Sequence, residues 1–210
     1  MKSAVIVVLV AVALNGCAMG GTYSVSEPYI TETSEHRLDA DGTFYADGIV
    51  YRVIPLNYKP GIDAVGPVLP LIPIMCCRNL DRSGQSFHVA LYFYPQSEEF
   101  TLTPSGIMLD IDGKTLSPTA AGGPFPCAAD EARHTKCTYQ EQDLTTNDLS
   151  KPVQIRRGSY ILAYPVMTPD PKQPFAIRIA GVHRKEQLLS APQINFKGIS
   201  HGSWFPFAGP

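Results

Sequence analysis

The chain has 210 residues, of which 44% are hydrophobic and 17% charged, with 19 prolines and 17 glycines. This much apolar surface offsets the entropy of ordering the backbone, so most of the chain is expected to fold. The frequent prolines exclude a helical bundle, because proline breaks helix interiors. The formal net charge of -2 excludes a strongly basic surface, and no nucleic-acid partner is expected.

The first 16 residues have the organisation of an export signal. Lys2 gives a positive start, and residues 4–14 form an unbroken apolar run. Such a run fits a secretory signal and is too short for a permanent membrane-spanning helix. The sequence Leu-Asn-Gly-Cys then ends at Cys17. This combination resembles the lipobox of bacterial lipoproteins, in which the cysteine thiol receives a lipid and the preceding peptide is removed. The alternative is an ordinary cleaved signal whose Cys17 enters a disulfide.

The resemblance implies a mature chain that begins at Cys17 and is held on a membrane by acyl chains such as palmitate. Several acyl chains at one end anchor a protein stably, whereas one chain holds it only marginally. In the enterobacterial class, an aspartate after the cysteine retains the protein in the inner membrane. Ala18 therefore favours the outer membrane, with the protein facing the periplasm. Residues 17–41 are polar and weakly periodic, which predicts a flexible, lipid-anchored tether.

Beyond the tether, the pattern is that of short β-strands. Two β-rich runs, residues 43–46 and 49–54, flank Asp47-Gly48, which is a strong hairpin signal. Residues 86–94 are apolar at both sets of alternate positions, as in a central strand. Further strands are expected at residues 100–103, 107–111, 114–116, 159–166, 175–182 and 188–196.

We expect residues 42–210 to form one all-β domain. Strands that follow one another without helical crossovers favour antiparallel sheets. An antiparallel immunoglobulin-like β-sandwich is therefore predicted, with a barrel as the alternative. Residues 100–104, with the strand and turn that follow, and residues 174–179 resemble small β-sandwich lipoproteins. That resemblance implies fold and location but no activity.

A long insertion interrupts this pattern. Residues 118–151 almost lack apolar periodicity, and compact domains seldom hold an unstructured loop of that length. The insertion is either a functional excursion or a loop stapled by its cysteines. The cysteines other than Cys17 are Cys76, Cys77, Cys127 and Cys137.

An even number of cysteines in an exported chain predicts disulfides. Pairings that join the adjacent cysteines to the long insertion are favoured, because they would pin it to the body. The alternative pairs the two adjacent cysteines with each other and the two insertion cysteines with each other. The spacing lacks the C-x2-C of structural zinc sites, so no metal is expected.

Residues 64–77 form a charge-free segment with three prolines, which bar it from a central strand. It is expected to be a flap that closes one edge or end of the sandwich. Alternatively, it is an exposed loop that docks a partner or dips into the bilayer, as contiguous apolar patches do. Trp204 belongs to an aromatic stretch near the C-terminus that either packs on the core or extends the same surface. The predicted partner-contact residues are Leu69, Leu71, Ile72 and Trp204.

No motif for catalysis or cofactor binding is found in the sequence: it has neither a nucleophile elbow nor a glycine-rich phosphate loop. Asp110 and Asp112 could share a strand face and bind a cation or act as acid and base. However, Asp112-Gly113 is typical of a tight turn. His88 is expected to be packed or hydrogen-bonded. A dispersed Ser-His-Asp site is recognised only by geometry. We expect no cofactor and no enzyme activity.

These observations predict a non-catalytic envelope lipoprotein that acts as an interaction or structural module, with an envelope protein as its partner. The lipid would localise the domain and raise its effective concentration near that partner. One alternative is a carrier of a lipid or small apolar ligand, which needs a cavity of about 300 Å³ or more, lined by Tyr92 and Tyr94. The other is a hydrolase with a dispersed triad.

Overall fold

The structure is a computed structural model of the chain. It describes residues 16–29, 37–38, 42–46, 48–67, 72–74, 82–128, 136–137, 139–189 and 193–208. In this part the regular structure is β-strand, apart from two 3-10 turns, η2 (Pro104–Gly106) and η3 (Glu141–Asp143). No helix in the described ranges has the length and apolar character needed to cross a bilayer. The prediction of an all-β chain is confirmed.

Sheet A is the larger of two main sheets, with the strand order β10-β9-β16-β19-β1-β5-β6. Its strands are β1 (Gly16–Tyr29), β5 (Lys59–Pro67), β6 (Ile72–Ile74), β9 (Ile107–Ile111), β10 (Lys114–Leu116), β16 (Phe175–Ile179) and β19 (Gln193–Ala208).

Sheet B has the order β11-β15-β7-β4-β3-β2. Its strands are β2 (Arg37–Leu38), β3 (Thr43–Ala46), β4 (Ile49–Pro55), β7 (Ser86–Pro95), β11 (Ala120–Phe125) and β15 (Gly158–Met167).

Two smaller sheets complete the fold. One has the order β14-β8-β17-β18 and the other contains β12 and β13. Their strands are β8 (Phe100–Leu102), β12 (Cys127–Ala128), β13 (Lys136–Cys137), β14 (Val153–Gln154), β17 (Val182–Arg184) and β18 (Gln187–Leu188). All strand pairs in the two main sheets and the two smaller ones are antiparallel, as the sequence predicts.

Sheets A and B share one apolar core. The ring of Phe87 in sheet B meets the ring of Phe175 in sheet A edge-on, with 5.4 Å between centroids. Phe175 stacks in turn on Phe196 at 4.9 Å. The Tyr164 hydroxyl of β15 donates to the carbonyl of Ile107 in β9 at 3.0 Å. These contacts join two layers into a sandwich-like body.

Local sequence signals predict the hairpins correctly. β3 and β4 are joined across a two-residue turn, with Ala46 opposite Ile49. Gly48 in that turn has φ 78°, which is costly for residues with a Cβ. Asp112 and Gly113 have φ 51° and 72°, so the second Asp-Gly pair is also a tight turn. β7 lies between β15 and β4 and is buried on both faces, as expected of a central strand.

The structure differs from the expected flexible tether over residues 17–41. β1 occupies its first part and pairs with β19 along its whole length, from Gly16 opposite Ala208 to Tyr29 opposite Asn195. β5 pairs with the other side of β1. Two neighbouring strands provide hydrogen-bond partners for the backbone of this polar segment. Pairing with distant parts of the chain therefore makes it a strand, although its local composition is typical of a tether.

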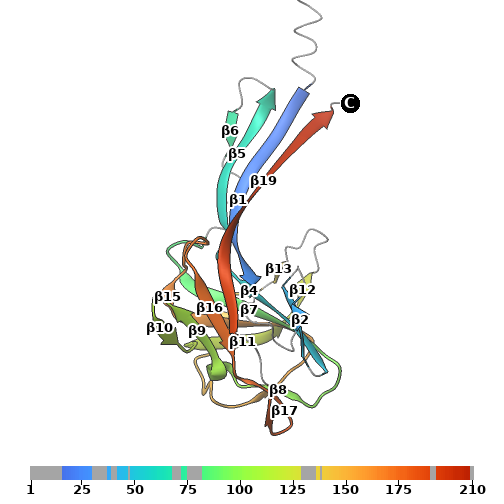
Figure 1. The fold of residues 1–210 in the computed structure, drawn as a ribbon, viewed down its shortest axis with the longest axis vertical. Coiled ribbons are helices and arrows are strands. Elements are labelled where there is room, and N and C mark those ends of the chain that lie inside the picture. The colour runs from blue at the N-terminus through green and yellow to red at the C-terminus, as the bar shows by residue number, and fades with distance from the viewer. Residues whose placement is uncertain are drawn as a thin grey trace, which may run out of the picture.

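β5 and β6 place part of the apolar segment 64–77 in sheet A. β6 is the edge strand of sheet A. Proline is tolerated there, because the backbone N–H that Pro73 lacks is not needed to pair with a further strand. Figure 1 shows β1, β5, β6 and the C-terminal part of β19 rising together from the body as a narrow arm. We define the arm as residues 16–24, 59–67, 72–74 and 199–208. It extends away from the sandwich and does not close it.

The long insertion is also partly ordered. β11 is the edge strand of sheet B and pairs with β15. Beyond it, Ala121 and Thr145 exchange two backbone hydrogen bonds of 3.0 and 2.9 Å. The insertion therefore folds back along the edge of sheet B.

Candidate functional site

The arm brings together three segments that are far apart in the sequence. Its central strand, β1, starts at Gly16, next to Cys17. In the register, Cys17 lies opposite Phe207 of β19 on one side and opposite Pro67 of β5 on the other. Cys17, the described part of the apolar segment and the aromatic C-terminal stretch thus meet at the arm's far end (Figure 1).

Two of the predicted partner-contact residues fall in this arm. Trp204 lies in β19 opposite Gly20 of β1. Ile72 begins β6, opposite Val65 of β5. The other two, Leu69 and Leu71, lie outside the described residues.

Side-chain contacts fix the base of the arm. The ring of Tyr23 stacks on Tyr58 at 5.5 Å and on His201 at 5.1 Å. His201 also lies 2.9 Å from the carboxylate of Glu27 through its Nε2. The arm's direction is therefore held by packed rings and by a polar contact between β1 and β19.

A polar junction ties the same region to the body. Buried Asn57 donates to Ser26 Oγ at 2.9 Å, and Ser26 donates to the carbonyl of Pro171 at 3.1 Å. Lys59 forms a 2.6 Å ion pair with Asp170. Sequence reasoning missed this junction, because its paired residues are 31, 111 and 145 positions apart and carry no motif.

The cysteine register bears on the disulfide prediction. Cys127 and Cys137 lie directly opposite each other in β12 and β13. This backbone register sets the two positions opposite each other, as the alternative pairing within the insertion requires. Cys76 and Cys77 lie outside the described residues.

Asp110 and Asp112 have structural partners. Asp110 accepts hydrogen bonds from Arg178 at 2.6 Å and Thr115 at 2.5 Å. Partial burial raises the pKa of Asp110, but these two donors outweigh burial and hold the pKa below its ordinary value. Asp112 accepts from Gln173 at 2.9 Å. The turn interpretation holds, and the two carboxylates serve different partners.

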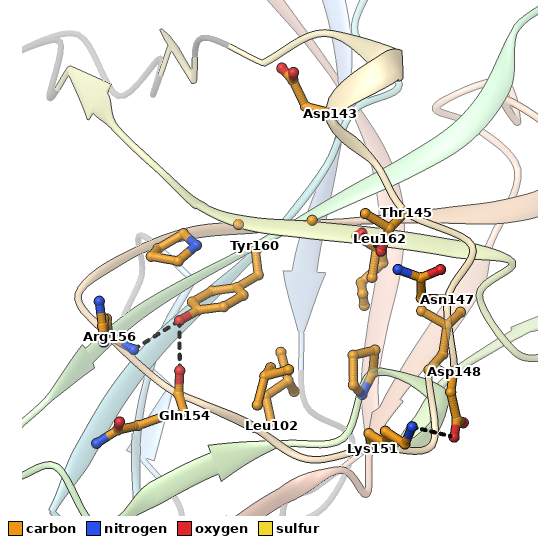
Figure 2. A pocket seen from close by; sticks show the side chains of 17 residues that line it. Leu102, Asp143, Thr145, Asn147, Asp148, Lys151, Gln154, Arg156, Tyr160 and Leu162 are labelled. Atoms are coloured by element: carbon orange, nitrogen blue, oxygen red, sulfur yellow. Dashed lines mark hydrogen bonds and ion pairs between the residues drawn. The ribbon is translucent and has the colours of Figure 1, made fainter.

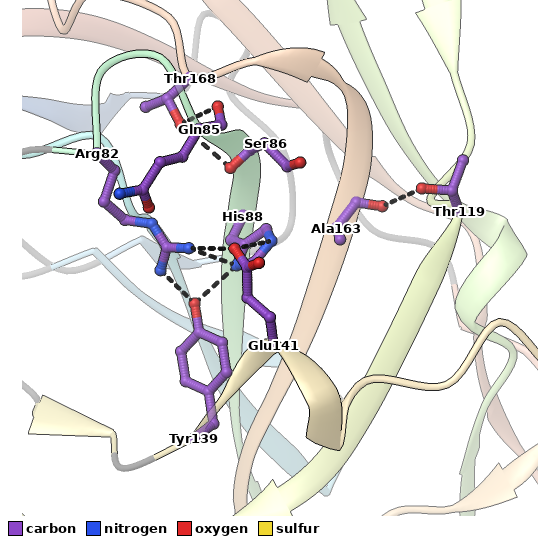
Figure 3. Close-up of polar contacts among 9 residues, drawn as sticks. All are labelled: Arg82, Gln85, Ser86, His88, Thr119, Tyr139, Glu141, Ala163 and Thr168. Atoms are coloured by element: carbon purple, nitrogen blue, oxygen red, sulfur yellow. Dashed lines mark hydrogen bonds and ion pairs between the residues drawn. The ribbon is translucent and has the colours of Figure 1, made fainter.

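His88 lies in a polar cluster between β7 and the long insertion (Figure 3). It is 2% exposed. Its Nδ1 lies 2.7 Å from the Tyr139 hydroxyl and 3.0 Å from Arg82 Nη2. Arg82 also donates to the Tyr139 hydroxyl at 2.5 Å and to Glu141 at 3.4 Å. The expectation of a hydrogen-bonded histidine is confirmed.

This environment keeps His88 neutral. Burial and then the Arg82 charge lower the pKa of His88 to about 4, although Glu141 opposes them. Because arginine can only donate, Nδ1 must accept, and the network assigns the proton to Nε2. A histidine with an occupied Nδ1 and so low a pKa is a poor general base near pH 7. The cluster instead clamps the insertion to sheet B.

The insertion also forms one wall of an open pocket of about 870 Å³. Figure 2 shows it between β11, the segment 143–151 and β14, with Tyr160 and Leu162 of β15 in its floor. Tyr92 and Tyr94 are not among its lining residues; they stack on each other at 5.4 Å. The pocket is larger than the roughly 300 Å³ that a carrier needs. However, the carrier hypothesis expects Tyr92 and Tyr94 to line the cavity, and they do not line this one.

The described residues show no arrangement for catalysis by serine or metal. None of the hydrogen bonds between them joins a serine hydroxyl to a histidine ring. No cluster of three or more His, Cys, Asp or Glu side chains within these ranges could hold a metal ion.

Comparison with known proteins finds no matching family model, curated protein or solved structure. No relative therefore supplies a function or a set of site residues.

Proposed function

We propose that the chain is a lipid-anchored envelope protein of the outer membrane that faces the periplasm and acts as a non-catalytic interaction or structural module. Cys17 carries the lipid after removal of residues 1–16. The arm stands on the membrane and presents the sandwich-like body to an envelope protein partner.

One observation carries this proposal: Cys17 and both apolar segments lie at the same end of one arm. β1 is flanked there by β19 and β5, with Phe207 and Pro67 opposite Cys17. An acylated cysteine at this position would bring the arm's end to the bilayer surface. Aromatic residues such as Trp204 and Phe205 favour that interface, because their rings have both apolar and polar parts.

The arm replaces a flexible tether as the spacer in this account. The part of β1 that lies in the arm, residues 16–24, corresponds to about 30 Å at the rise of an extended strand. The packed base around Tyr23 and the Lys59–Asp170 ion pair support a body held at a set distance from the membrane. The immunoglobulin-like assignment belongs to the same proposal, supported by two antiparallel sheets around one core.

Metabolic labelling tests the lipid directly. Cells that produce the full chain are grown with an alkyne analogue of palmitate, and the purified protein is examined for the label. We expect label in the wild type and none in Cys17→Ser. Cys137→Ser is the matched control, because it removes a cysteine outside the arm and should keep the label.

Fractionation completes the experiment. The labelled wild type should enter the detergent phase and sediment with outer membranes, and Cys17→Ser should remain in the aqueous phase. An exported wild-type protein that carries no lipid would overturn the proposal.

A further inference from the structure

The polar side chains that line the pocket beside the long insertion differ in whether the chain itself provides them with hydrogen-bond partners. Both of its carboxylates are engaged by donors of the chain itself. Asp143 accepts from the backbone N–H of Gln140 at 2.7 Å. Asp148 accepts from Ser150 at 3.1 and 2.5 Å and pairs with Lys151 at 3.7 Å.

Two donors in the pocket lining are not engaged. Among the described residues, no hydrogen bond or ion pair holds the guanidinium of Arg156 or the side-chain amide of Asn147, and both line the pocket. Figure 2 shows Arg156 beside Tyr160, apart from Asp143 and from the Lys151–Asp148 pair. The pocket therefore has an unpaired positive charge on one side.

The backbone fixes where Arg156 stands. Ile155 is buried in the core and its N–H donates to the carbonyl of Phe100 at 2.9 Å, so its two exposed neighbours face outward. The Tyr160 hydroxyl accepts from the N–H of Arg156 at 2.8 Å and donates to the carbonyl of Gln154 at 3.2 Å. Arg156 thus extends from a segment whose backbone is held on both sides.

Apolar side chains line the same pocket. Val153 lines the pocket and is 43% exposed, and Pro124 is exposed on the facing strand, β11. A volume of about 870 Å³ is within the range of small-molecule sites, which combine apolar walls with a few polar groups. The site offers one planar cation and an apolar wall, which is the complement of an organic monoanion.

We propose that this pocket binds a small organic acid, with its carboxylate on the guanidinium of Arg156 and its apolar part against Val153. Arginine recognises a carboxylate through two parallel N–H donors. The proposal does not rest on lipid attachment, because the pocket lies in the body and not in the arm.

A matched pair of probes tests it: 2-naphthoate, which has the carboxylate, and 2-naphthamide, which has the same rings without the charge. Both are titrated into the full chain by calorimetry. If the chain is acylated it is held in nanodiscs, with empty nanodiscs as the blank. We expect naphthoate to bind about tenfold or more tightly than naphthamide, as a charge-assisted contact allows.

Two arginine variants locate the contact. Arg156→Gln should remove the preference for naphthoate. Arg157→Gln is the control, because Arg157 lies over the Tyr94 ring at 5.4 Å outside the pocket lining, and it should keep the preference. Val153→Asp should weaken both probes.

Three results would each overturn the proposal. They are equal affinities for the two probes, a preference that survives in Arg156→Gln, and no saturable binding of naphthoate up to about 10 mM, a limit of roughly 3 kcal/mol in binding free energy. Thermal unfolding of each variant shows whether a lost signal comes from lost folding.

Discussion

His88 is a buried titratable residue whose surroundings decide its protonation. It is 2% exposed and contacts Arg82 and Tyr139. A protonated ring would place a second positive charge beside Arg82 and lose the acceptor at Nδ1. The folded chain therefore favours the neutral ring, and acid must weaken the attachment of the insertion to sheet B.

This gives a pH dependence of stability with a definite sign. The pKa of His88 is about 4 in the folded chain and 6.5 as its ordinary value. Between these values the unfolded chain binds a proton that the folded chain does not, so stability is lost as pH falls from 6.5 to 4. The full loss is about 3 kcal/mol, since one pKa unit corresponds to 1.36 kcal/mol.

Urea unfolding at a series of pH values checks this. His88→Asn, which keeps an acceptor near Nδ1, should lose about 3 kcal/mol less than the wild type over that range. His183→Gln, in β17, should retain the wild-type slope. A His88→Asn slope equal to that of the wild type would show that His88 is not the group responsible.

Gly48 makes a second prediction at this scale. It has φ 78°, and an added Cβ would lie 3.3 Å from the ring of Phe100. Gly48→Ala should lower the free energy of unfolding by about 1–2 kcal/mol, because L-residues are strained there. Gly202→Ala is the control, since its Cβ would meet only Thr22 at 3.8 Å. Urea unfolding that shows equal stability in both variants contradicts the prediction.

At the scale of elements, the sequence predicts the turns and strands whose formation depends on the pattern of neighbouring residues. The Asp-Gly turns, the central strand β7 and the apolar strands β9, β15 and β16 follow from short-range signals. The arm does not, because β1 pairs with β19 across most of the chain length and its polar residues are typical of a linker. The sequence does not predict β11 either, because its Ala-Ala-Gly-Gly-Pro-Phe sequence has low strand propensity.

The candidate sites also include residues that the sequence predicts and one that it does not. The sequence predicts the importance of Cys17, Ile72 and Trp204 from composition and the lipobox resemblance, and the register brings their strands together. Arg156 has no motif. Its role depends on Tyr160 and on the folding of the insertion, so only the three-dimensional arrangement reveals it.

The pair β12 and β13 predicts a disulfide between Cys127 and Cys137. Opposite residues of antiparallel strands have Cα separations of about 4.5–5.5 Å, which a disulfide can span. Closing a loop of this size would contribute about 2–3 kcal/mol in the chain-entropy model. Peptide mapping of the exported protein without reductant should recover the two cysteines in one linked species. Recovery of either one linked to Cys76 or Cys77 would contradict this pairing.

The whole molecule has two parts, the arm and the body (Figure 1). The arm carries Cys17 and parts of the apolar segments. The body carries the filled core, the clamp around His88 and the pocket with Arg156. A membrane contact at the arm's end would leave the pocket free to bind its ligand in the aqueous space.

The most direct measurement uses Trp204, the one tryptophan of the chain. The full protein is reconstituted into vesicles with and without phospholipids brominated on their acyl chains, which quench tryptophan only at close range. The account predicts strong quenching and a blue-shifted emission in the wild type, and neither in Cys17→Ser mixed with the same vesicles. An acylated wild-type protein whose emission is unaffected by the brominated lipids would show that the arm's end does not lie at the membrane.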